Sequence, residues 1–278
     1  MMRRFALPRL PALAASTLLA LALTATAAQG HGTPAPEHGH GARAVHDLHF
    51  GSRVAVPPGG TARATVHCPH GETPTGGGGA GSDGVHLVAS TTHGGDDWTV
   101  RGFNGSDDAP GTLTPFVACA EHGARFGGNG PQTTLAPGVN GSVSNACPSG
   151  EVVTGGGWDT SDDRVFVTQG IATGDQWTVR GANRTGDGQG PSVTLMCSDR
   201  PHSQHTGRQV LVKPGQTASA TAVCPPDEVP TGGGGSARDD TFLSGSAATA
   251  DDRGWETRAT NTGTEPQTLY AQVICAAP

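Results

Sequence analysis

The chain has 278 residues, including 44 glycines, and its formal net charge at pH 7 is −7. Such an acidic chain lacks the clustered cations that bind phosphates, which excludes a nucleic-acid-binding protein. Aromatic residues make up only 4% of the sequence, so the hydrophobic core is expected to be thin and to depend on covalent cross-links.

The first 28 residues have the composition of an export signal. Arg3 and Arg4 precede an apolar stretch over 13–23, and Ala25-Thr26-Ala27 forms a small-x-small cleavage site. The apolar run is shorter than the roughly 20 residues that a membrane helix needs, so no membrane span is expected. Residues 1–28 are therefore predicted to be a signal peptide, and the mature protein is predicted to be secreted to the extracellular space.

Residues 29–50 are rich in His, Gly and Pro, have no apolar period, and are predicted to be a disordered arm. Clustered histidines in an arm can bind Cu(II), Ni(II) or Zn(II). Cleavage after Ala28 would place His31 third from a free amine, an end that can wrap a square-planar metal, whereas cleavage after Ala27 would not. The alternative is a solvated tail without a metal. The candidate metal ligands are His31, His38, His40, His46 and His49.

Four landmarks recur three times after the arm. In each copy a Cys-Pro pair is followed by a glycine run that begins eight residues after the Cys. A Trp comes 30 or 31 residues after that Cys, and a second Cys comes 50 or 51 residues after it. This recurrence predicts three tandem repeats at 51–121, 131–199 and 208–278.

Each repeat is predicted to consist of about six short strands. Apolar side chains alternate with polar ones before the first Cys, as in Ala62, Ala64 and Val66, and a Pro-Gly pair ten residues before that Cys fits a type II turn. No stretch has a helical period. The expected fold is all-β, with three tandem disulfide-stapled antiparallel repeats that are sandwich-like or barrel-like. The repeats are either separate beads or lobes packed with pseudo-three-fold symmetry.

An even number of cysteines in an exported chain favours disulfides. Two pairings fit the three-fold recurrence: one closes each repeat on itself, and the other joins neighbouring repeats and closes a ring through Cys275 and Cys68. We favour the first, in which each bridge closes a 50-residue loop and stabilises the fold by about 4 kcal/mol. The pairs are then Cys68–Cys119, Cys147–Cys197 and Cys224–Cys275.

The glycine runs are not predicted to be phosphate-binding loops, because no Lys-Ser/Thr and no helix follows them. Glycine within a strand marks close approach of another group. The recurring Trp98, Trp177 and Trp255 are therefore predicted to cover the bare glycine surface.

The Trp strand carries a recurring Arg and a recurring Asn. One interpretation pairs each Arg with the recurring acid Glu72, Glu151 or Glu228 as a structural ion pair. The other makes Arg and Asn the donors of a ligand-binding face for a glycan or a cell-wall acid. Trp158 occurs only in the second copy and is predicted to be an exposed binder. The candidate ligand-binding residues are Trp158, Arg101, Arg180, Arg258, Asn104, Asn183 and Asn261.

Recurring Asp83, Asp162 and Asp239 are predicted to cap their own turns, because one or two carboxylates are too few for a calcium site. The sequence has no Gly-x-Ser-x-Gly elbow and no His-Glu-x-x-His motif. We therefore expect no enzyme and no cofactor.

The pattern Cys-Pro-x5-Thr-Gly-Gly-Gly, followed by Trp and a closing Cys, resembles repeats of uncharacterised secreted proteins of high-GC Gram-positive bacteria. The resemblance covers residues 51–278 and implies architecture without an activity. The favoured function is a secreted, non-catalytic binding or structural module of the cell envelope or extracellular space, with a cell-wall or extracellular glycan as partner. The alternatives are a His-rich extracellular metal-binding protein and a secreted hydrolase.

Overall fold

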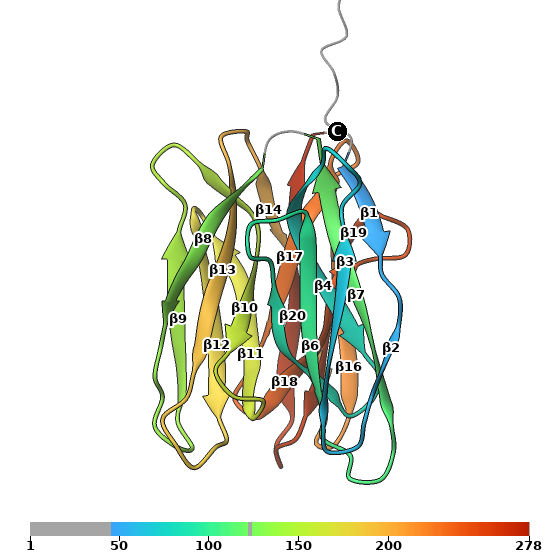
Figure 1. Ribbon diagram of the computed structural model, residues 1–278, viewed down its shortest axis with the longest axis vertical. Coiled ribbons are helices and arrows are strands. Elements are labelled where there is room, and N and C mark those ends of the chain that lie inside the picture. The colour runs from blue at the N-terminus through green and yellow to red at the C-terminus, as the bar shows by residue number, and fades with distance from the viewer. Residues whose placement is uncertain (1–45, 122–123, 278) are drawn as a thin grey trace, which may run out of the picture. The chain divides into compact units, whose positions relative to one another are not determined.

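The computed structural model describes residues 46–121 and 124–277, and within them the secondary structure is entirely β (Figure 1). The first repeat contains β1 (His46–Phe50), β2 (Val54–Val56), β3 (Thr61–His67), β4 (Thr73–Gly81), β5 (Val85–Thr91), β6 (Asp97–Asn104) and β7 (Gly111–Ala120). The second contains β8 (Arg125–Gln132), β9 (Asn140–Ala146), β10 (Val152–Thr160), β11 (Val165–Thr173), β12 (Gln176–Asn183) and β13 (Pro191–Ser198). The third contains β14 (Ser203–Thr206), β15 (Val210–Val212), β16 (Thr217–Val223), β17 (Val229–Ala237), β18 (Thr241–Ala248), β19 (Gly254–Asn261) and β20 (Gln267–Ala276).

The strands form three antiparallel sheets, and each sheet contains strands of two repeats. Sheet A has the order β1-β7-β4-β18-β19-β16, with β2 beside β7. Sheet B has the order β3-β6-β5-β10-β13-β8, and sheet C has β14-β20-β17-β11-β12-β9, with β15 beside β20. No sheet closes on itself among the described strands. Strands from distant parts of the chain therefore run side by side in Figure 1.

The contacts between repeats follow a cyclic rule. Strand β5 of the first repeat pairs with β10 of the second, β11 of the second pairs with β17 of the third, and β18 of the third pairs with β4 of the first. These three junctions occupy equivalent positions, and the buried residues of all repeats form one core cluster. The repeats are thus lobes related by pseudo-three-fold symmetry and not separate beads.

The glycine strands β4, β10 and β17 meet at the pseudo-three-fold axis. The hydroxyl of Thr154 donates to the carbonyl of Thr75 (2.7 Å), Thr75 donates to Thr231 (2.7 Å), and Thr231 donates to Thr154 (3.0 Å). The next residue in each strand is a glycine. A Cβ added at Gly155 would lie 2.7 Å from the Cα of Gly76, closer than real Cβ atoms approach other atoms. The recurrence of Thr-Gly thus reflects three backbones in contact.

Two predictions about the core are confirmed. The disulfides pair Cys68 with Cys119, Cys147 with Cys197, and Cys224 with Cys275, so each bridge lies within one repeat. A Cβ added to the second glycine of each run would overlap the indole of the Trp in the same repeat. All three of these Trp side chains are fully buried. The indoles therefore fill the volume that the glycines leave open.

The alternation before the first Cys also forms as predicted, because Ala64 and Val66 of β3 are buried and their neighbours are exposed. The Pro-Gly pairs form the expected turns. In the first of them, Gly59 has φ of +60°, and the amide of Gly60 donates to the carbonyl of Pro57 (3.1 Å). A positive φ at this position is the reason that a type II turn takes glycine.

The predicted repeat boundaries need correction. The last residues of the predicted disordered arm, 46–50, form β1 and pair with β7 in sheet A. The predicted linkers also contain strands, because β8 pairs with β13 and β14 pairs with β20. Each repeat therefore begins with an additional strand beside its last one. Residues 1–45, with the predicted signal peptide and the rest of the arm, lie outside the described residues.

Candidate functional site

The recurring arginines join neighbouring repeats. Arg101 pairs with Asp159 (3.1 Å) and Asp163 (3.0 Å) of the next repeat, and Arg180 pairs with Asp239 (3.2 Å). Arg258 pairs with Asp83 of the first repeat. The predicted pairing of Arg with the Glu of its own repeat is wrong, because the cyclic strand junctions bring the Asp-containing turn of the next repeat beside each Arg.

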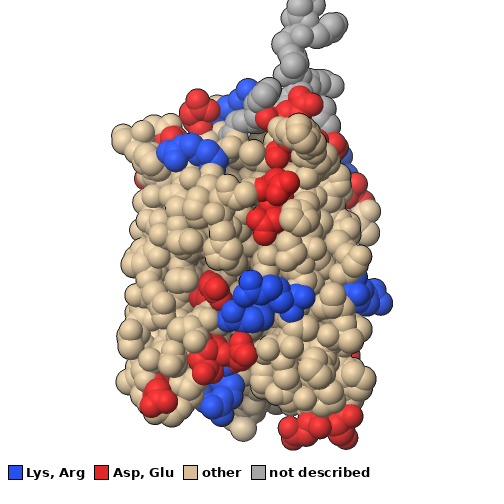
Figure 2. All heavy atoms as spheres, in the orientation of Figure 1, with Lys and Arg blue, Asp and Glu red and all other residues tan. Residues whose placement is uncertain are grey.

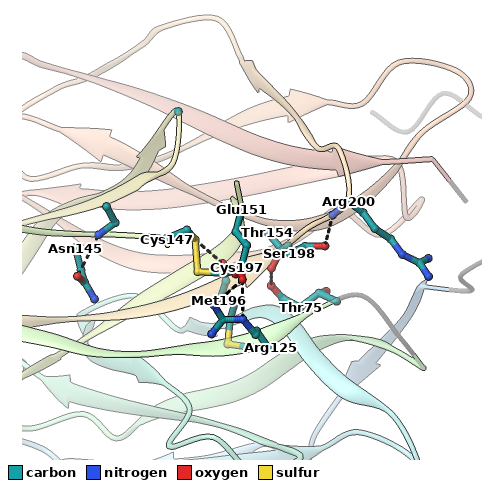
Figure 3. The surroundings of a disulfide bond; sticks show 12 residues. Thr75, Arg125, Asn145, Cys147, Glu151, Thr154, Met196, Cys197, Ser198 and Arg200 are labelled. Carbon is teal, nitrogen blue, oxygen red and sulfur yellow. Dashed lines mark hydrogen bonds and ion pairs between the residues drawn. A yellow bond between two sulfur atoms is a disulfide. The ribbon is translucent and has the colours of Figure 1, made fainter. Parts of the chain in front are cut away.

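The recurring glutamates contact the first strand of their own repeat instead. Glu151 accepts two hydrogen bonds from Arg125, at 2.6 and 3.0 Å, beside the Cys147–Cys197 bridge (Figure 3). In the third repeat, Glu228 accepts a hydrogen bond from the hydroxyl of Ser203 and lies 3.9 Å from His205. The pocket beside Arg125 has a volume of about 310 Å³. This ion pair lies in its wall, which also includes Asp199.

The predicted ligand donors Asn104, Asn183 and Asn261 are fully buried. The amide of Asn183 donates to the carbonyls of Leu135 (2.8 Å) and Asp187 (2.7 Å), and the other two make equivalent bonds. These side chains hold the turn after the Trp strand. Their interpretation as ligand donors is wrong because a ligand cannot reach them and their N–H groups are already bonded.

Trp158 is 1% exposed, so its prediction as an exposed binder is also wrong. It replaces the fourth glycine of the run, and its ring lies against Gly170. The first and third repeats have Ser90 and Ser246 where the second has Gly170. Those serines accept hydrogen bonds from Trp98 (3.0 Å) and Trp255 (2.9 Å). In the second repeat a glycine replaces this serine and leaves space for the Trp158 ring. The indole N–H of Trp177 is therefore buried without a hydrogen-bond partner among the described residues.

The histidines named as metal ligands fall into two groups. His31, His38 and His40 lie outside the described residues, whereas His46 and His49 lie in β1. Burial, followed by the nearby His202 and Arg200, lowers the pKa of His46 to about 4. His49 lies close to Glu72 and Cys119, and His205 lies close to Glu228 and Cys275. Both cysteines are in disulfides, so each of these groups provides only two metal-binding side chains.

The recurring Asp residues differ in role. Asp162 caps its own turn by accepting from the amide of Arg164 (2.8 Å), as predicted. Asp83 and Asp239 instead pair with the Arg of the preceding repeat in the cycle. Asp239 also has a φ of +31°, which is uncommon for a residue other than glycine.

The strand junctions between repeats reach the protein surface, and the three sheets differ in how open the surface is there. In sheet B, Asp159 pairs with Arg101 at the junction, and the Arg101 side chain is only 19% exposed. Figure 2 shows basic and acidic groups side by side on one face of the protein, among mostly uncharged residues. Sheet A has a groove of about 350 Å³ that includes Phe50, Ala80, Ser246 and Arg258. Sheet C has a more polar groove of about 410 Å³, here called groove C. Groove C is lined by, among others, Gln169, Arg180, Ser236, Arg238, Asp239 and Tyr270.

Groove C contains two departures from the repeat that sequence reasoning missed. Arg238 stands where the other repeats have Ser82 and Ser161. Those hydroxyls accept hydrogen bonds from the backbone amides of Thr112 and Gly190, each at 3.0 Å.

Tyr270 pairs with Ser236 across the strands, at the position of Thr114 in the first repeat and Ser192 in the second. The signal was available in the sequence. A position-by-position comparison of the three repeats identifies the positions at which one copy differs from the other two.

A second cluster lies at equivalent positions at the start of β5, β11 and β18. The rings of His86, Phe166 and Phe242 are 4.8 to 5.8 Å apart between centroids. His86 is 7% exposed, and burial lowers its pKa to about 4. Its Nδ1 is buried, and no described residue forms a hydrogen bond with it. This cluster packs the three repeats together.

The fold and the three bridges define an all-β, disulfide-stapled repeat protein suited to an oxidising environment. Across 46–121 and 124–277 there is no helix that could cross a membrane. No known family model and no curated protein matches the chain.

Proposed function

We propose that the protein is a secreted, non-catalytic binding module of the cell envelope or extracellular space, and that groove C binds an extracellular glycan. The observation that carries the proposal is the concentration of side chains that the repeat does not require, Arg238 and Tyr270, in one open groove. The shared fold explains the residues that recur in all three repeats. It does not explain a residue that departs from the repeat at a single junction, and ligand binding is the reason that we propose for such a departure.

The chemistry of groove C suits a sugar. Carbohydrates present hydroxyl groups that need donors and acceptors, and pyranose rings present apolar C–H faces. Gln169, Ser236 and Thr268 provide polar groups, and the half-buried Tyr270 provides an aromatic face on which a ring can pack. Arg180 is fixed by Asp239 (3.2 Å) and can donate from a defined position.

The metal-binding alternative receives less support. His46 and His49 are strand residues with partly buried rings, which removes them from a freely moving arm. Among the residues that the structure describes, the two groups near disulfides each have only two available ligands. No group of described residues specifically favours the hydrolase alternative.

The test is binding of the recombinant protein to a panel of bacterial and plant polysaccharides, measured by isothermal titration, with the variant Tyr270→Thr. The first repeat folds with Thr114 at this position, so the variant should keep the thermal stability of the parent. It should lose at least about tenfold in affinity, which corresponds to about 1.4 kcal/mol. Thr114→Ser on sheet A is the matched control and should bind normally. The proposal fails if no polysaccharide binds, or if Tyr270→Thr binds as tightly as the parent.

A further inference from the structure

Groove C carries one more positive charge than its own carboxylates offset. Its described lining includes Arg180 and Arg238 but only one acidic side chain, Asp239, which pairs with Arg180. Arg238 is exposed and makes no ion pair with any described residue. The whole chain has a formal charge of −7, so the excess charge of groove C is opposite in sign to that of the molecule. The groove therefore favours an anionic group at Arg238.

The fold does not need this arginine. At the equivalent positions, Ser82 and Ser161 accept hydrogen bonds from the opposite strand. Position 238 has no hydroxyl to accept from the corresponding amide of Thr268. The third repeat therefore lacks the hydrogen bond that this serine accepts in the other two repeats, and it has the positively charged Arg238 at the groove instead.

The other groups near Arg238 favour an acceptor-rich ligand. The side-chain oxygen of Gln169 accepts from the hydroxyl of Ser236 (2.9 Å), which leaves the amide NH₂ of Gln169 free to donate. A guanidinium offers planar, paired N–H donors that match the two oxygens of a carboxylate. One uncompensated cation matches a group of one negative charge.

We propose that groove C selects glycans that carry a carboxylate, as uronic acids do, and that Arg238 binds this carboxylate while the sugar ring packs on Tyr270. The proposal rests on the proposed function, because it names the ligand class of the same groove. Nucleic acids and polyphosphates are not expected to bind, since a polyanion would also meet the net negative charge of the whole chain.

The experiment compares a neutral oligosaccharide that ends in a single galacturonic acid residue with the methyl ester of the same compound, which has the same sugar backbone without the charge. The variant is Arg238→Ser, which restores the residue of the other repeats and should keep or raise the melting temperature. Arg63→Ser is the control, because it removes one exposed arginine from β3 in sheet B. Binding is measured by isothermal titration at low and at moderate ionic strength.

We expect the parent protein to bind the acid at least tenfold more tightly than the ester, and this preference to shrink as salt rises. Arg238→Ser should lose the preference while Arg63→Ser keeps it. Equal binding of acid and ester by the parent would overturn the assignment of a carboxylate but leave the glycan site standing. Unchanged acid binding by Arg238→Ser would overturn the role of Arg238. If no carbohydrate of any charge binds, the proposed function fails as well.

Discussion

The pseudo-three-fold axis and groove C are both contacts between repeats, but they differ in how far the three copies share the same residues. At the axis all three copies keep Thr followed by Gly, because the backbones of β4, β10 and β17 touch there. At the outer junctions the copies differ, with Arg238 in one groove where Ser82 and Ser161 stand elsewhere. Backbone contact allows only glycine, whereas an outward side chain can change without disturbing the fold. The residues that hold the repeats together are thus separated in space from the groove for which we propose binding.

The largest effect is expected at the axis, for Gly155→Ala. The new methyl would lie 2.7 Å from the Cα of Gly76 and 2.5 Å from the carbonyl oxygen of Thr75, and neither can yield without moving a strand. We expect a loss of more than about 4 kcal/mol in the free energy of unfolding, read from urea denaturation. Gly186→Ala is the control, because a Cβ there meets no atom within 4 Å and should cost less than about 0.5 kcal/mol.

Removing a bridge should cost about as much. Cys147→Ala together with Cys197→Ala opens a loop of 50 residues and should lower the free energy of unfolding by about 4 kcal/mol. The second repeat contributes strands to sheets B and C. We therefore expect the melting temperature of the whole molecule to fall in one calorimetric transition. A separate transition with about one third of the total unfolding enthalpy would mean that the second repeat unfolds independently, which would contradict the sharing of sheets between repeats.

The exceptional packing of the second repeat can be tested by a double-mutant cycle. Trp158→Gly alone leaves a cavity and should cost about 3 kcal/mol. Gly170→Ser alone would place its Cβ 2.9 Å from the Trp158 ring and should cost about 2 kcal/mol.

The double variant recreates the arrangement of the first and third repeats and gives Trp177 an acceptor. Its measured cost should be smaller than the sum of the two by about 2 kcal/mol. Strict additivity would show that the two residues do not compensate each other.

The smallest effect concerns pH. Burial lowers the pKa of His86 to about 4 from an ordinary value of 6.5, so the folded state takes up this proton less readily than the unfolded state. The contribution of neutral His86 to the free energy of unfolding is fully present above pH 6.5 and is lost as the pH falls toward 4.

The variant His86→Phe restores the ring found in the other two repeats and cannot be protonated. Its advantage in unfolding free energy over the parent should grow by about 2 kcal/mol between pH 7.5 and pH 4.5. The lowered pKa of His46 affects both proteins equally and cancels in this comparison. An advantage that is the same at both pH values would show that His86 is not the titrating group.

Much of the architecture was predictable from the sequence, because recurrence is visible in one chain. The positions of Cys68, Trp98 and their counterparts identify the repeats, the bridges and the indoles that cover glycines. These are contacts within one repeat, where spacing along the chain constrains distance. The alternation of β3 likewise follows from strand geometry.

The contacts between repeats were decided by the tertiary structure alone. Nothing in the spacing of Arg101 indicated that its partners would be Asp159 and Asp163 of the next repeat. The burial of Trp158 depends on a serine-to-glycine exchange at position 170, twelve residues away on another strand. Local patterns specify strands and the pairs within a lobe. The groove that carries the proposed function exists only where two lobes share a sheet, and long-range packing determines which lobes meet.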